Sequence, residues 1–68
     1  MKIFAKRLKE LRNEKNLSIR KFSQILGIAD TSYARYENNT SEPTQEMLVK
    51  IARYFGVTVG YLLGEEDY

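Results

Sequence analysis

The side chains that could do chemistry in this 68-residue chain are cations, carboxylates and hydroxyls, because cysteine and histidine are absent. The usual zinc and iron ligands are therefore missing, and acid/base catalysis by histidine is excluded. Serine, lysine and aspartate are present, but nothing in their spacing orders them into a nucleophile–base pair. We expect neither an enzyme nor a site for a metal or another cofactor, and the remaining chemistry is charge and hydrogen bonding.

Charge is distributed unevenly along the chain. Residues 1–36 carry nine Lys/Arg and three Asp/Glu, whereas residues 37–68 carry two Lys/Arg and six Asp/Glu. The net charge of +2 therefore divides into a basic half of +6 and an acidic half of −4. A basic half suggests a face that meets an anionic partner such as nucleic acid. The alternative is a dipolar soluble protein without such a partner.

Composition also restricts the class of protein and its location. The length allows one small domain, and contents of 43% hydrophobic and 29% charged residues favour a folded chain over a disordered one. There is no cysteine for the disulfides of a secreted mini-protein and no apolar run near the ~20 residues that span a bilayer, and residues 1–12 lack the apolar stretch typical of a signal peptide. We expect a cytoplasmic protein with no membrane partner, and we predict no small-molecule ligand.

Helical periodicity predicts the elements that must position the charged side chains. Residues that end helices divide the chain at Asn16, Gly27, Asn39, Gly56 and Gly64. The expected N-caps are Ser18, Thr44 and Thr58. No alternating segment predicts a strand, so the expected fold class is all-α, a compact five-helix bundle. We expect one domain over residues 1–64 and a short acidic tail over residues 65–68.

Two of the predicted helices, Ser18–Leu26 and Asp30–Asn38, are joined by a short glycine-containing turn and form a helix-turn-helix candidate. Such a pair needs apolar residues that lock the helices together, a small residue where they cross and a glycine in the turn. Ser23 is the small residue and Gly27 the glycine, and the apolar residues are Phe22, Leu26, Ile28, Tyr33 and Tyr36. The two tyrosines could instead stack on single-stranded bases, but their spacing favours the core.

Motifs along nearly the whole chain resemble the Cro/repressor (XRE-like) helix-turn-helix family, which is of the lambda-repressor-like type. They are Arg7-Leu8-Lys9-Glu10-Leu11-Arg12, Leu17-Ser18, Leu26-Gly27-Ile28, Arg35-Tyr36-Glu37-Asn38, Glu42-Pro43, Phe55-Gly56-Val57 and Tyr61-Leu62-Leu63-Gly64. The resemblance covers about residues 3–64 and agrees in order and spacing. It implies a sequence-specific transcriptional regulator that binds double-stranded DNA, with repression as the expected mode.

The resemblance also implies which residues meet DNA. In this family the second helix of the motif enters the major groove, and its implied base-reading residues are Asp30, Thr31, Ser32 and Arg35. Arg35 is the principal reader, because a guanidinium can bond guanine O6 and N7 together. Asp30 has a structural alternative: Ala29 is a poor N-cap, so Asp30 could cap the helix. The implied phosphate contacts are Ser18, Arg20, Asn38, Asn39 and Thr40.

Two further pairings follow from the resemblance. Arg12 and Glu37 are expected to form a buried, structural ion pair that ties the first helix to the end of the third. Val59, Tyr61 and Leu62 on the last helix are expected to contact a second copy, with completion of the monomer core as the alternative. A homodimer on a two-fold operator is therefore expected, at least on DNA.

The chain departs from the family pattern at the phosphate contacts. Ile19 stands where glutamine is usual, and isoleucine cannot bond a phosphate; Thr40 and Ser41 replace residues that are often basic. The weaker contact keeps one alternative open, a protein-interaction module of the same fold, such as an antitoxin or anti-regulator. A separate alternative is that these residues are the DNA-binding domain of a longer regulator.

Overall fold

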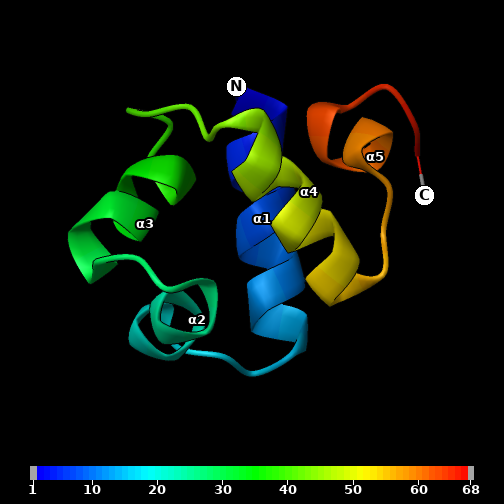
Figure 1. Ribbon diagram of the computed structural model, residues 1–68. Helices are drawn as coiled ribbons and strands as arrows, with labels where there is room; N and C mark the ends of the chain where they lie inside the picture. The colour runs from blue at the N-terminus through cyan, green and yellow to red at the C-terminus, as the bar shows by residue number, and fades with distance from the viewer. Residues whose placement is uncertain (1, 68) are drawn as a thin grey trace.

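The computed structural model describes residues 2–67, and within this range it contains helices and no strand. The helices are α1 (Lys2–Glu14), α2 (Ile19–Leu26), α3 (Asp30–Glu37), α4 (Gln45–Phe55) and α5 (Val59–Leu63) (Figure 1). The predicted all-α, five-helix class is confirmed. None of these helices has both the length and the apolar character to cross a membrane. Met1 and Tyr68, the outer ends of the expected domain and tail, lie outside the described residues.

Local capping chemistry explains where the helices begin and end. The hydroxyls of Ser18, Thr44 and Thr58 each accept a hydrogen bond from the amide three residues later, at 3.0, 3.1 and 2.9 Å. Gly27 ends α2 with φ of 76°, a left-handed conformation that costs glycine little. Asn39 adopts φ of 61° after α3, where its short polar side chain makes this conformation tolerable. These capping and turn residues are the ones that the sequence predicts.

One apolar core fills the space between the helices. Its fully buried members are Phe4, Leu8, Phe22, Leu26, Tyr33, Ile51 and Leu62. The rings of Phe22 and Tyr33 meet edge to face with centroids 5.4 Å apart and so lock α2 to α3. Tyr33 is in the core, as its spacing predicts, and presents no ring to a base. Ser23 is also fully buried, and its hydroxyl donates to the Ile19 carbonyl at 2.7 Å.

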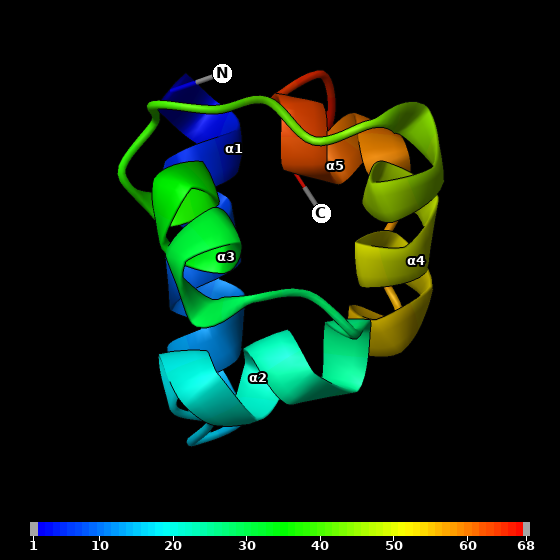
Figure 2. The same cartoon turned by 60° about the vertical axis from the view of Figure 1, so that its left-hand side comes forward.

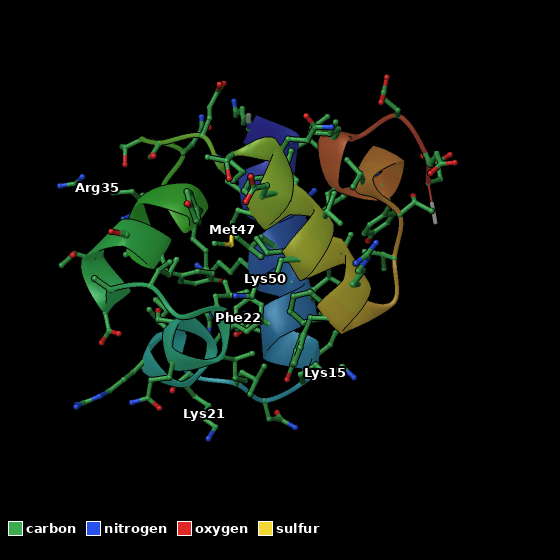
Figure 3. The ribbon with its side chains drawn as sticks, in the orientation of Figure 1. Lys15, Lys21, Phe22, Arg35, Met47 and Lys50 are labelled. Atoms are coloured by element: carbon green, nitrogen blue, oxygen red, sulfur yellow. The ribbon has the colours of Figure 1, made fainter. Side chains whose placement is uncertain are left out.

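The packing leaves one side of α3 uncovered. α1 packs against both α3 and α5, α2 packs against α3, and α4 packs against α5. Figure 2 shows α3 and α4 on opposite sides of the molecule. Lys50 reaches from α4 to the end of α2, where its ammonium group donates to the Leu26 carbonyl at 2.8 Å (Figure 3). The helix-turn-helix is therefore fixed from behind while the outer side of α3 faces solvent.

Arg7 holds the segment that follows α5. Its guanidinium donates to the carbonyls of Tyr61 and, at 2.6 Å, of Glu66, and it lies 4.2 Å from the centroid of the Tyr61 ring. The Glu66 carboxylate accepts a hydrogen bond from the Thr58 hydroxyl. The beginning of the acidic segment is therefore packed onto α1 and α5. Arg7, one of the cations of the basic half, is therefore engaged in contacts within the fold.

Candidate nucleic-acid interface

The first turn of α3 contradicts one of the two roles that the sequence suggested for Asp30, that of the helix cap. Ala29 is the N-cap of α3 and makes no side-chain cap hydrogen bond, while Asp30 is the first helical residue. The expectation that Asp30 caps the helix is therefore wrong, because a residue with helical backbone lies past the N-cap position. Its carboxylate is exposed and still interacts favourably with the helix dipole from the first turn.

The other three expected base-reading residues lie on the exposed part of the same helix. Thr31, Ser32 and Arg35 are all exposed, and the Arg35 side chain extends away from the body of the molecule (Figure 3). The Arg35 carbonyl accepts hydrogen bonds from the Thr40 amide at 2.9 Å and the Thr40 hydroxyl at 3.3 Å. These bonds fold the following loop back onto α3 and leave the Arg35 guanidinium free to extend outward.

The expected phosphate-contacting residues lie on the two segments that flank α3. Ser18 and Arg20 are exposed at the start of α2. The Ser18 oxygen accepts a hydrogen bond from the Lys21 amide at 3.0 Å, which leaves its hydroxyl proton available to an outside acceptor. Exposed residues also follow α3, and they are Asn38, Asn39 and Thr40. The arrangement can offer donors on both sides of a groove that receives α3.

Sequence reasoning missed Lys21. Its side chain is exposed on the first turn of α2 and points outward from the molecule (Figure 3). The signal that could have identified it is the adjacent pair of cations, Arg20 and Lys21, directly after the Ser18 cap. Ile19, which lies between Ser18 and this pair, is half-buried and packs against the core.

Behind this surface, Arg12 and Glu37 join α1 to the last turn of α3. Arg12 donates from Nε to Glu37 Oε2 at 2.6 Å and from Nη2 to Oε1 at 3.1 Å, a bidentate pair. Arg12 Nη1 also donates to the Leu17 carbonyl at 2.7 Å, and the Tyr33 hydroxyl donates to Glu37. The Arg12 and Glu37 side chains are only 10% and 5% exposed. The network fixes α1, the loop before α2 and α3 relative to one another.

The protonation of this network is well defined at neutral pH. Burial raises the pKa of the Tyr33 hydroxyl far above its ordinary value, and the hydrogen bond to Glu37 raises it further. The hydrogen bond to Glu37 raises the pKa of the Arg12 guanidinium, while burial opposes this effect. Tyr33 is therefore a neutral donor and Arg12 a permanent cation, and both bond the same carboxylate.

The expected dimer contacts on α5 need one correction. Val59 and Tyr61 are half-buried, whereas Leu62 has no exposed surface. Leu62 belongs to the monomer core, so it offers no surface to a second copy. Sequence reasoning missed the exposed apolar side chains nearby, which are Ile3 at 49% and Leu63 at 37% exposure. Both line one shallow depression between the start of α1 and the end of α5.

The packed pair α2 and α3, with an exposed second helix, defines a helix-turn-helix domain. A family model described as Helix-turn-helix matches residues 8–62, most of the chain. The chain therefore belongs to the XRE-type helix-turn-helix family, and the predicted resemblance is confirmed.

Curated relatives share this region. The chain is 43% identical over 60 residues to the HTH-type transcriptional regulator AnsR of Bacillus subtilis, covering 88% of the chain and 52% of that protein. It is 26% identical over 65 residues to the cryptic phage CTXphi transcriptional repressor RstR of Vibrio cholerae, covering 96% and 59%. It is 34% identical over 64 residues to the antitoxin PezA of Streptococcus pneumoniae, covering 94% and 40%. The chain spans about half the length of the curated relatives it matches.

Proposed function

We propose that this chain is a sequence-specific regulator of transcription that binds double-stranded DNA and acts as a repressor in the cytoplasm. The observation that carries the proposal is the exposed outer side of α3, with the Arg35 guanidinium extended away from a rigid support. Similarity to proteins named as transcriptional regulators, one of them a repressor, supports the same function. No catalytic role is part of the proposal.

In the proposed complex α3 lies in the major groove. Its base-reading residues are Asp30, Thr31, Ser32 and Arg35. Phosphate contacts come from the start of α2 and from the loop after α3, and they comprise Ser18, Arg20, Lys21, Asn38, Asn39 and Thr40. Arg12 and Glu37 make no DNA contact in this arrangement; they hold α3 at the correct angle.

The proposal includes a homodimer, because two copies related by a two-fold axis double the DNA contact. The surface proposed for this contact contains Val59 and Tyr61 of α5 together with the exposed Ile3 and Leu63. Leu62 would support this surface from beneath. The two half-sites of the operator should then lie about one helical turn apart, ~34 Å.

Selection of bound duplexes from a random DNA library, with the mass of the complex measured, tests the proposal. We expect a two-fold motif bound by two copies, with affinity that falls steeply as salt increases. Arg35→Ala should weaken selective binding, whereas Arg53→Ala on α4 is the matched control and should retain it. Binding that is insensitive to salt, or a library in which no duplex is enriched, would contradict the proposal.

A second candidate function, binding of another protein, is supported by the similarity to an antitoxin and by Ile19. The chain resembles an antitoxin, and Ile19 occupies a position where a phosphate contact is expected. A protein-interaction module of the same fold would use this surface for another protein. Tight binding of a protein partner that survives Arg35→Ala, in a chain that enriches no duplex, would support this second function over the first.

A further inference from the structure

Asp30 and Arg35 carry opposite charges on one short helix, α3. Asp30 is not the N-cap, because Ala29 holds that position. Both side chains are exposed, and within residues 2–67 neither takes part in a side-chain hydrogen bond or an ion pair. A carboxylate and a guanidinium are therefore both available to a partner of α3.

These two groups select different base edges in the major groove. Guanine presents two acceptors, N7 and O6, which a guanidinium can bond together. Cytosine presents one donor, N4, with no acceptor beside it on the same base. Adenine also presents a donor, N6, but the acceptor N7 lies beside it, and thymine presents the acceptor O4. A carboxylate can only accept, so Asp30 favours cytosine and Arg35 favours guanine.

Asp30 and Arg35 are five residues apart, so their side chains leave α3 about 140° apart around its axis, and their separation along the axis sets the spacing of the bases. Five residues of α-helix advance ~7.5 Å along the axis, at ~1.5 Å per residue. Base pairs are ~3.4 Å apart, so this advance corresponds to about two base-pair steps. Asp30 is in the first turn of α3, at the end whose residues contact base edges in this class of motif, and the Arg35 side chain leans toward that end from the last turn.

We infer that Asp30 and Arg35 together select, in each half-site, a cytosine and a guanine about two base pairs apart. This inference rests on the proposed function and names the bases that the same surface reads. Asp30 also repels phosphates and therefore lowers affinity for every sequence except one that offers it a donor. Asp30 therefore contributes to specificity largely by weakening the binding of sequences that lack this donor.

The test is duplex selection with the wild-type chain and with the variants Asp30→Ala, Asp30→Asn and Arg35→Ala. The wild-type motif should contain the cytosine and the guanine at this spacing. Arg35→Ala should reduce the preference for guanine by roughly 5- to 150-fold, and Asp30→Ala should remove the preference for cytosine. Asp30→Asn should change the preferred base from cytosine to adenine, because an amide can bond adenine N6 and N7 together.

Glu46→Ala and Arg53→Ala are the matched controls, because these residues occupy the first and last turns of α4 on the far side of the molecule. Both should leave the selected motif unchanged, and thermal unfolding of every variant verifies the fold. A wild-type motif without the cytosine–guanine pair, or one that Asp30→Ala and Asp30→Asn both leave intact, overturns the inference while the proposed function stands. If the wild-type chain enriches no duplex at all, the proposed function itself fails.

Discussion

Arg12 and Glu37 form a bidentate ion pair across α1 and α3, with hydrogen bonds of 2.6 and 3.1 Å and almost no exposed surface. The pair lies directly behind the helix that carries Asp30 and Arg35. The helix therefore has a charged pair on its buried side that fixes its position, and charges on its exposed side that remain available. This division of roles links the stability of the domain to its proposed recognition of DNA.

Removing one partner of the buried pair should destabilise the domain strongly. Arg12→Ala leaves the Glu37 carboxylate buried without its cation, and Glu37→Ala leaves the Arg12 guanidinium without its acceptor. Each change should lower the free energy of unfolding by about 3–5 kcal/mol. Denaturant unfolding measures this decrease. Glu10→Ala removes an exposed acid from α1 and should change the free energy of unfolding by less than about 0.5 kcal/mol. If Arg12→Ala or Glu37→Ala destabilised the domain no more than Glu10→Ala does, the buried pair would not contribute to stability.

The double variant of Arg12→Ala with Glu37→Ala provides a further check. Because neither charge is then left without a partner, its destabilisation should be clearly smaller than the sum of the two single effects. Additive effects would mean that the residues act independently, in contradiction to their geometry.

The buried Tyr33 hydroxyl predicts a loss of stability in alkali. Its pKa is raised in the folded state, whereas an unfolded tyrosine ionises near pH ~10. The unfolded chain therefore binds fewer protons above pH ~10, and the free energy of unfolding should fall by up to about 1.4 kcal/mol per pH unit for this group. Below pH ~10 the contribution is fully present. Urea unfolding at a series of pH values measures the slope.

Tyr33→Phe should show a shallower alkaline slope than the wild-type chain. It should also be less stable at neutral pH, because Glu37 loses a donor. The control is Tyr54→Phe, which changes a tyrosine that is 40% exposed and should keep the wild-type slope. An unchanged slope in Tyr33→Phe would contradict the assignment of the effect to this hydroxyl.

Features that depend on neighbouring residues could be predicted from the sequence. Ser18 begins α2 because its hydroxyl reaches an amide three residues away, and Gly27 ends it because glycine tolerates the left-handed conformation. Helical spacing alone places Tyr33 in the core. Each of these features depends on contacts within about one turn or on one face of a single helix.

Features that depend on distant segments could not be predicted from local patterns, and the pair of Arg12 and Glu37, 25 residues apart, follows only from the family resemblance. Arg7 lies among the lysines of α1 and looks like another surface cation, but its partners Tyr61 and Glu66 are 54 and 59 residues away. Leu62 shows the same limit, because periodicity identifies an apolar face without saying whether the monomer or a second copy covers it. For Asp30 a shift of one residue in the start of α3 decides between a cap and a free carboxylate.

The Arg7 contacts predict that one substitution loosens the end of the chain. Arg7→Ala removes the donors to Tyr61 and Glu66 and should lower the free energy of unfolding by about 1–3 kcal/mol. The Glu65 amide, which bonds the Gly60 carbonyl at 2.8 Å, should exchange its hydrogen faster. Hydrogen exchange followed by NMR measures this change. Lys6→Ala removes an exposed cation beside Arg7 and should leave the exchange unchanged; equal acceleration in both variants would contradict the role of Arg7.

The cations at the start of α2 should supply affinity without selecting a sequence. Arg20→Ala and Lys21→Ala each remove one proposed phosphate contact, so each should weaken binding to specific and random duplexes by the same factor. The slope of log affinity against log salt should become less steep by about 0.9 for each phosphate that is no longer neutralised. Fluorescence anisotropy titrations at several salt concentrations measure both quantities.

Arg53→Ala removes a cation from the far side of the molecule and should leave the slope unchanged. If Lys21→Ala instead altered which duplexes are selected, Lys21 would contact bases rather than phosphates, and the assignment of α3 as the sole reading element would have to be revised.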